Sequence, residues 1–449
     1  MSAGPARAPA RTSVLVTLGA LVLVLGVAPF VPRGGDDEGA LVPSGGGEYV
    51  ANQAAAVGYG RLTPALRAEV DRVVAQGRVL GRSLARGRAT TARQVATYVR
   101  CAELEGQRYC LGTGWTDDTE AQVQARTEAA AGTAGASHVE RTGDLDARAT
   151  LARAARMTVA RRARAERAEL TMAARSVAKV WLVRHEIEGV PLPAGFLARH
   201  PEARVSAAKA AAAPTGTATA TVSPWPTPTT AAPTTPTTAI PSTPPTGTPT
   251  TKPSSSTTYD GLPESASVLD SSQVAEQERN YWCGPTAMQM IAWGWKGKYR
   301  SQEHWAQRLG TTSGGSSITA MVRVTNDRTG WDLPQYAGPY IALDVKHYSF
   351  DSWQLLLMKH VVDLRAPMIL HVQLLRQFFP YLDHDGSGHF QVGRGYDKRG
   401  DKPDLIGYFE PWNQQRFHPD EPFIDRVQWR DAYKSYRANE AHFQHNLGV

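Results

Sequence analysis

Hydrophobic positions first mark the N-terminus of the chain. An uncharged run spans residues 12–32, and residues 14–25 are almost wholly apolar. Arg7 and Arg11 precede the run and acidic residues 36–38 follow it, a charge order that places the N-terminus inside and the rest outside. The run is longer than a usual signal core of about 7–15 residues and reaches the lower end of a spanning helix, about 17–25.

Residues 1–32 are therefore predicted to be a signal peptide or a single-pass membrane anchor, in an extracytoplasmic protein that is membrane-anchored or secreted. A small-x-small cleavage pattern at residues 26–28 is followed directly by Pro29, which favours the uncleaved anchor. Residues 33–60 are rich in glycine and are predicted to be a flexible segment.

Apolar residues then recur at helical spacing, as Leu66, Val70, Val73, Val74 and Leu80 show. The sequence predicts an Ala/Arg-rich helical region over residues 61–210, with a first helix starting at Thr63-Pro64 and one or two long helices over residues 119–188. The glycine-containing residues 108–118 are predicted to be a loop. Such a region would suit a spacer or a partner-binding module. Its isolated histidines, at 138, 185 and 200, are expected at the surface.

Residues 211–258 are Thr, Pro, Ser and Ala in low complexity and predict an extended, disordered linker. The last segment, residues 259–449, holds eight of the eleven tryptophans, which is enough for a sizeable core. Its pattern predicts helices at residues 287–295, 301–309, 319–325 and 351–363, and strands at residues 340–348, 367–374, 388–396 and 405–410. Helices followed by strands indicate an α+β fold.

Charge is distributed unevenly along the chain. Residues 259–449 carry 20 Lys and Arg against 22 Asp and Glu, which leaves 29 basic and 20 acidic residues of the chain's 49 and 42 for the remainder. Solvated helix faces account for most such patterns. The alternative is contact of the basic helical region with a cell wall or an anionic membrane. No nucleic-acid partner is predicted.

The three cysteines predict one disulfide and one free thiol. Cys101 and Cys110 lie close together and would form the bridge, which fits an exported protein because disulfides persist outside the cytoplasm. Cys283 stands alone, just before the apolar, helix-like residues 287–295. Free N–H groups and the dipole at a helix start favour the thiolate, the reactive form of cysteine.

A cysteine nucleophile needs a histidine base and a group that orients it. His389 opens a predicted strand 106 residues after Cys283, and Glu410 ends the next strand. If the two strands are antiparallel neighbours, Glu410 lies beside His389 and can accept its second N–H. Alternatively, His389 is a structural histidine and Glu410 an exposed carboxylate.

The motifs Cys283-Gly-Pro-Thr-Ala and Gly-His389-Phe, followed by an acid-Pro pair, resemble the exported C-39-like branch of the papain-like bacteriocin-processing (double-glycine) peptidase superfamily. The resemblance covers residues 274–412. It implies an α+β papain-like cysteine peptidase domain and an oxyanion-hole glutamine before the cysteine, here Gln277, with Gln273 as the alternative. Glu410 departs from the family's usual Asp or Asn, and no ATP-transporter segment follows, so the resemblance leaves the substrate open.

One rival signal is metal-like. Asp383, Asp385 and Ser387 occupy calcium-loop positions, but Arg394 stands where the loop needs a glutamate. Asp383, His384 and His389 could hold a transition metal, yet their spacing matches no strong motif. No metal or other cofactor is therefore predicted.

Taken together, the sequence predicts an exported or surface-tethered cysteine peptidase or amidase that acts on a peptide or protein through Cys283, His389, Glu410 and Gln277. Two alternatives remain open. One is a noncatalytic peptide- or wall-binding module on a papain-like scaffold, and the other is a transglutaminase-like acyltransferase that uses the same residues.

Overall fold

The computed structural model describes residues 40–41, 57–85, 90–133, 139–203, 262–297, 299–399, 401 and 403–449. The chain divides into two units, Met1–Asp37 and Glu38–Val449, and every described residue belongs to the second. The predicted anchor (residues 1–32) and linker (residues 211–258) therefore lie outside the described residues. Among the described residues, we find no helix with the length and hydrophobicity that crossing a bilayer requires.

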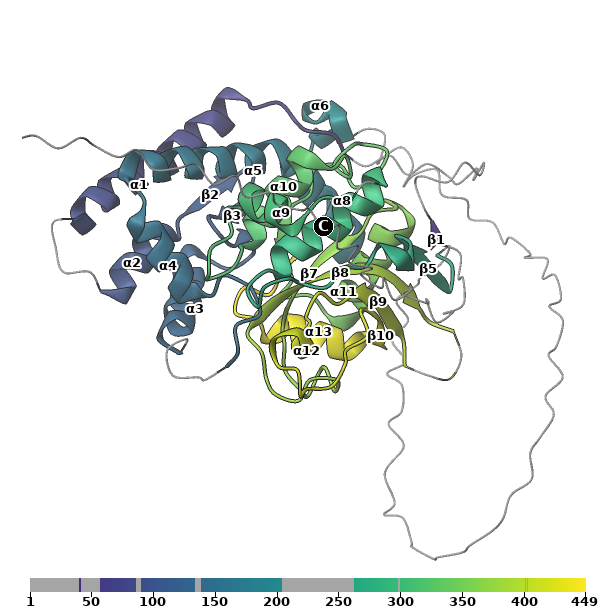
Figure 1. Cartoon of the computed structure of the whole chain (residues 1–449). Coiled ribbons are helices and arrows are strands. Elements are labelled where there is room, and N and C mark those ends of the chain that lie inside the picture. The colour runs from purple at the N-terminus through teal and green to yellow at the C-terminus, as the bar shows by residue number, and fades with distance from the viewer. Residues whose placement is uncertain are drawn as a thin grey trace, which may run out of the picture. The chain divides into compact units, whose positions relative to one another are not determined.

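The described residues form a mixed α+β structure (Figure 1), which agrees with the predicted class. Its helices are α1 Pro64–Ala85, α2 Thr91–Tyr98, α3 Glu120–Thr133, α4 Ala147–Arg156, α5 Val159–Glu188, α6 Phe196–Arg199, η1 Pro201–Ala203, η2 Ser271–Gln273, α8 Cys283–Lys296, α9 Gln302–Leu309, α10 Ile318–Arg328, α11 Phe350–Val362, α12 Gln414–Phe417 and α13 Ala432–Ala441. Its strands are β1 Ala40–Leu41, β2 Cys101–Leu104, β3 Gln107–Cys110, β4 Gly114–Trp115, β5 Ser265–Val268, β6 Ala342–Asp344, β7 Met368–Gln373, β8 Gly388–Asp397, β9 Leu405–Phe409, β10 Val427–Asp431 and β11 Asn446–Gly448.

All these strands join one sheet in the order β1-β5-β8-β7-β11-β6-β4-β3-β2, and β9 branches from β8 and carries β10. Strands β7, β8 and β9 are consecutive antiparallel neighbours, with Ile369 opposite Val392 and Val392 opposite Phe409. Helix α8 packs against β8. This register brings the start of β8 next to the end of β9. The predicted His389 and Glu410 therefore meet at the same end of these two strands.

Several helices begin where the sequence predicts. The Thr63 hydroxyl accepts the Leu66 N–H at 3.2 Å at the start of α1, as the Thr63-Pro64 signal indicates. Helices α9 and α11 start behind the serine caps Ser301 and Ser349. The predicted strand at residues 340–348 is shorter than expected, and only Ala342–Asp344 are extended.

The predicted helical region over residues 61–210, with its loop at residues 108–118, is wrong at residues 101–115. Strands β2, β3 and β4 form there, and two of them lie within or across the predicted loop at residues 108–118. Glu105 and Gly106 have φ of 51° and 81°, the left-handed pair of a two-residue hairpin turn. This turn was not predicted, because the composition around it favours helix.

Residues 57–203 do not form a separate spacer. Trp115 of β4 pairs in parallel with Leu343 of β6, which joins the hairpin to the sheet of the C-terminal segment. One continuous hydrophobic core contains Leu66 of α1 and Leu170 of α5 together with Ile369 of β7. The helical region therefore belongs to the same folded body as the C-terminal segment.

Two smaller expectations also need correction. His200 is buried rather than exposed, because both ring nitrogens are held by carboxylates, Nδ1 by Glu202 and Nε2 by Glu105. Part of the predicted flexible segment at residues 33–60 is ordered. Strand β1 pairs with β5, and the Gly60 N–H donates to the Arg175 carbonyl at 2.7 Å.

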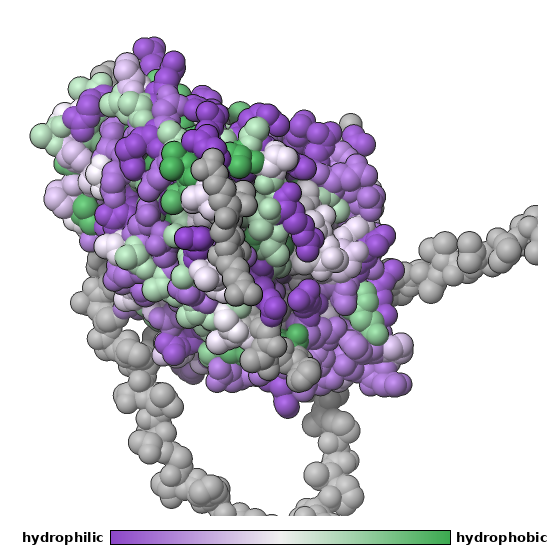
Figure 2. Space-filling view, turned by 90° about the vertical axis from the view of Figure 1, so that its left-hand side faces the viewer, coloured by the Kyte–Doolittle hydropathy of each residue, from purple (hydrophilic) through white to green (hydrophobic). Residues whose placement is uncertain are grey.

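Hydrophilic residues occupy most of the face in Figure 2, and hydrophobic residues interrupt it in patches. The large hydrophobic side chains that are exposed among the described residues are Val79, Leu197, Tyr299, Leu333, Phe423 and Tyr433. They come from elements distant in sequence, as is usual for scattered surface residues. The predicted contact of the basic region with a wall or membrane stays a prediction.

The Cys101–Cys110 disulfide is confirmed and joins β2 to β3 as a directly opposed pair, with the two Cα atoms 4.1 Å apart. We expect the Cys101→Ser/Cys110→Ser double variant to lose about 2–3 kcal/mol of unfolding free energy, because the unfolded chain regains the freedom of a short loop. Urea denaturation would measure this loss. Wild type denatured without a reducing agent is the reference. A urea midpoint of the variant equal to that of wild type would contradict the prediction.

Candidate active site

Cys283 is the first residue of α8 and is fully buried. The N-cap, Trp282, makes no side-chain hydrogen bond to the helix, so no side chain caps the first-turn N–H groups. Pro285 is tolerated in this turn because its missing N–H would have had no partner within the helix. The sequence therefore starts a helix at the thiol, and the Gly284 N–H of its first turn bonds the sulfur.

The thiol of Cys283 is nevertheless not activated in this conformation. Burial raises the pKa of Cys283 well above its usual value. Backbone N–H groups of Phe390 and Gly284 lower the pKa, while the charges of Asp144 and Glu410 raise it further. The expectation of a lowered pKa is therefore wrong for this conformation, because burial outweighs the helix start.

His389 and Glu410 meet as the strand order predicts. His389 Nε2 lies 2.7 Å from Glu410 Oε1, and both side chains are fully buried. Burial alone would raise the pKa of Glu410, but its interaction with His389 and the surrounding hydrogen bonds lower the pKa overall. Glu410 is thus a carboxylate that accepts a hydrogen bond from the His389 Nε2–H.

Other donors fix Glu410 in place. Oε2 accepts from the Tyr381 hydroxyl at 2.6 Å and from Gln391 Nε2 at 2.7 Å, and Oε1 also accepts from the Trp412 backbone N–H at 2.8 Å. With its Nε2 proton engaged, His389 keeps a lone pair on Nδ1, which has no hydrogen-bond partner among the described residues. Sequence analysis did not anticipate Tyr381 or Gln391.

Gln277 is buried, and backbone carbonyls hold its side-chain amide. Its Nε2 donates to the Arg279 carbonyl at 2.9 Å and to the Thr142 carbonyl at 3.4 Å. Its backbone N–H donates to the Pro411 carbonyl at 2.8 Å, one residue after Glu410. The alternative, Gln273, forms a capping box with Asp270 in η2. The amide aimed at a backbone carbonyl in the site is therefore that of Gln277.

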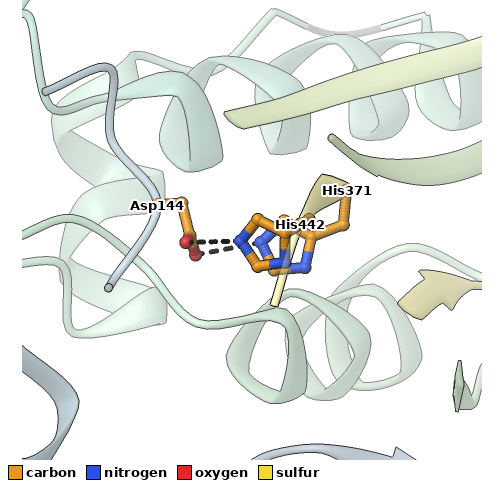
Figure 3. A group of neighbouring side chains, drawn as sticks. All are labelled: Asp144, His371 and His442. Carbon is orange, nitrogen blue, oxygen red and sulfur yellow. Dashed lines mark hydrogen bonds and ion pairs between the residues drawn. The ribbon is translucent and has the colours of Figure 1, made fainter. Parts of the chain in front are cut away.

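Asp144 is a second charged group that sequence analysis missed. Figure 3 shows its carboxylate facing the rings of His371 and His442. Oδ1 lies 3.0 Å from His371 Nε2, and Oδ2 lies 3.0 Å from His442 Nε2. Burial would raise the pKa of Asp144, but the charge of His371 and hydrogen bonds from both histidines lower it well below its usual value.

The outer nitrogens of these two histidines have different partners. His442 Nδ1 accepts the Gln444 backbone N–H at 3.2 Å, and burial lowers the pKa of His442 to about 4, so its single proton is on Nε2. His371 Nδ1 donates to Asn446 Oδ1 at 2.6 Å. Asp144, His371 and His442 each offer a ligand atom, and these atoms lie within 4.8 Å of one another, close enough to hold one ion.

The metal-like residues 383–389 do not converge as a calcium loop. Asp385 accepts the Arg376 N–H, and Ser387 contacts Thr142. Within the described ranges, Asp383, His384 and Glu421 do lie close enough for one ion. His389 is not in that group, because its Nε2 is bonded to Glu410.

Comparison with known proteins finds one family. The model of the family described as "Peptidase_C39 like family" matches residues 270–439, which include Cys283, His389, Glu410 and Gln277. No curated protein and no solved structure matches the chain.

Proposed function

Residues 270–439 belong to the Peptidase_C39 like family, and from this premise we propose that the protein is a cysteine peptidase or amidase acting through Cys283, His389 and Glu410. Membership implies a hydrolase whose substrate is a peptide or protein. The finer assignment of roles rests on the geometry of the site.

The observation that supports the proposal is the buried His389–Glu410 pair, 2.7 Å apart, whose carboxylate acts electrostatically on the thiol of Cys283. Glu410 holds the proton of His389 on Nε2, so Nδ1 is the basic nitrogen. The Phe390 N–H, next in sequence to His389, approaches the sulfur of Cys283. The strand that carries the proposed base thus also reaches the proposed nucleophile, through the Phe390 N–H.

Each step of hydrolysis has a group to perform it. His389 takes the proton of Cys283, and the thiolate attacks the amide carbonyl carbon. The oxyanion that forms can accept hydrogen bonds from Gln277 Nε2 and the Cys283 backbone N–H. His389 then gives its proton to the leaving amine, and water activated by the same histidine hydrolyses the thioester to the acid.

Export from the cytoplasm is part of the proposal. The charge order around residues 12–32 and the Cys101–Cys110 disulfide support it, because structural disulfides are rare in reducing compartments.

A peptide-library cleavage assay on the full chain tests the function. Cleavage that requires Cys283 supports the peptidase. Thiol labelling without turnover on any pool would favour a binding module, and transfer to an added amine in preference to water would favour an acyltransferase.

Glu410→Gln should lower kcat/KM by about 10²-fold, because a neutral amide still orients His389 but no longer stabilises the imidazolium that forms during reaction. The pH dependence of kcat/KM measures this loss. Glu303→Gln, an exposed change on α9, is the control. Equal kcat/KM in the two variants would show that Glu410 takes no part in the reaction.

A further inference from the structure

Residues 140–145, here called the strap, run past Cys283 between two backbone segments. One wall is the segment at Ser316, and the other is residues 387–388. On one wall the Ser316 N–H donates to the Gly143 carbonyl at 2.9 Å, and the Leu145 N–H donates to the Ser316 carbonyl at 2.8 Å. On the other wall the Asp144 N–H donates to the Gly388 carbonyl at 3.2 Å. Backbone pairing on both sides is how an extended peptide is bound in a groove.

More contacts fix the register of the strap on the second wall. The Ser387 N–H donates to the Glu140 carbonyl at 2.8 Å, and the Thr142 hydroxyl donates to the Gly388 carbonyl at 2.9 Å. Thr142 and Asp144 are both buried. The Thr142 carbonyl is also the group that Gln277 Nε2 reaches at 3.4 Å. The strap thus presents a backbone carbonyl to the residue proposed to hold the oxyanion.

Gly143 lies directly against the nucleophile. A Cβ at this position would come within 2.8 Å of both the backbone nitrogen and the sulfur of Cys283, and the φ of Gly143 is +119°. No residue with a side chain fits here without displacing the strap. The chain therefore places its smallest residue opposite the thiol.

Two carboxylates of the strap are each held by two histidines. Asp144 lies between His371 and His442 as Figure 3 shows. Glu140 Oε2 bonds His384 Nε2 at 2.7 Å, and Glu140 Oε1 bonds His418 Nε2 at 2.9 Å. The Asp144 contacts are buried, so their loss would leave an uncompensated buried charge and cost more than the loss of the Glu140 contacts.

We propose that the strap is a built-in occupant of the substrate groove that blocks Cys283, and that the groove binds extended peptides with glycine opposite the thiol followed by an acidic residue. This inference rests on the proposed function for its substrate class. It explains why the nucleophile, the base and Gln277 are all buried in a site that must admit a peptide. Activity then requires the strap to leave.

Thiol labelling tests the block without requiring turnover. Cys283 is the free cysteine, since Cys101 and Cys110 are paired, so iodoacetamide reports on it alone. In the folded wild-type chain the labelling should be slower than in urea by on the order of 10²-fold or more. Labelling as fast as in urea would overturn the proposal, whatever the enzyme activity.

Asp144→Lys should open the groove, because an ammonium cannot replace the carboxylate between two histidines. We expect labelling of Cys283 to rise at least about tenfold over wild type. Asp146→Asn is the control, since Asp146 only caps α4 and asparagine caps equally well. A folded Asp144→Lys chain that labels as slowly as wild type would overturn the proposal. If thermal melting shows that this chain does not fold, Asp144→Asn must meet the same tenfold criterion.

A peptide added in trans tests the substrate class. A synthetic peptide of residues 139–146 should restore protection of Cys283 in the opened variant, and the same peptide with Asn in place of Asp144 should need roughly tenfold higher concentration or more. Equal potency of the two peptides would overturn the acidic preference. Cleavage of the wild-type chain between Thr142 and Gly143, seen by mass spectrometry, would overturn the block and make the strap a substrate. Restored protection of Cys283 without hydrolysis of any peptide would support the strap as the occupant of the groove. The same result would contradict the proposed peptidase activity.

Discussion

Cys283→Ala and His389→Ala should each lower kcat by about 10⁴-fold or more while leaving the fold intact. Either change removes the unit that forms the thioester, because a thiol without its base is a weak nucleophile and the base alone has no thiol to activate. The double variant should lose no more than the worse single variant, since the two residues act together. Turnover should be measured in the Asp144→Lys background as well, where the strap does not limit access.

His347→Ala is the matched control for the histidine change. His347 is exposed and bonds Asp118, so its removal should leave kcat within about twofold. Full activity of a folded His389→Ala chain would rule out the proposed base. Multiplying losses in the double variant would show that the two residues act independently.

Gln277→Ala should lower kcat by about 10²–10³-fold with little change in KM, the usual effect of removing one oxyanion donor. Its Nε2 is already held by the Arg279 carbonyl and lies 3.4 Å from the Thr142 carbonyl, so little reorganisation precedes the reaction. Steady-state kinetics on a cleaved library peptide separates kcat from KM.

Gln273→Ala is the control for this prediction, because Gln273 caps η2 and is not the glutamine at the Thr142 carbonyl. Loss of stability without loss of kcat is expected there. A Gln277→Ala chain whose kcat falls by less than about threefold would assign Gln277 a packing role.

The contact between His389 and Glu410 could be predicted because local pattern and strand adjacency determine it. His389 at a strand start and Glu410 at the end of the next strand meet because β8 and β9 are antiparallel neighbours, which a short connection favours. The hairpin at residues 101–110 was missed because Glu105-Gly106 is a weaker turn signal than Asn-Gly or Asp-Gly, and the flanking composition favours helix.

The strap could not be found from local pattern at all. Gly143 precedes Cys283 by 140 positions, and nothing in its neighbourhood signals a groove contact. In the sequence, Asp144 resembles an ordinary surface carboxylate. Its role depends on His371 and His442, which lie more than 200 positions away and contact it only in the folded chain. The raised pKa of Cys283 has the same origin, because the residues that bury the thiol come from distant parts of the chain.

The shared hydrophobic core has a practical consequence for dissecting the molecule. Residues 57–203 and 262–449 are joined through β4 and β6 and through Leu66, Leu170 and Ile369 in one core. Expressed alone, the C-terminal fragment would leave the β6 edge unpaired and apolar surface uncovered, a combination that favours aggregation. The two fragments expressed together should instead assemble into a noncovalent pair. A protease that cuts the intervening residues would then nick the chain without releasing either half.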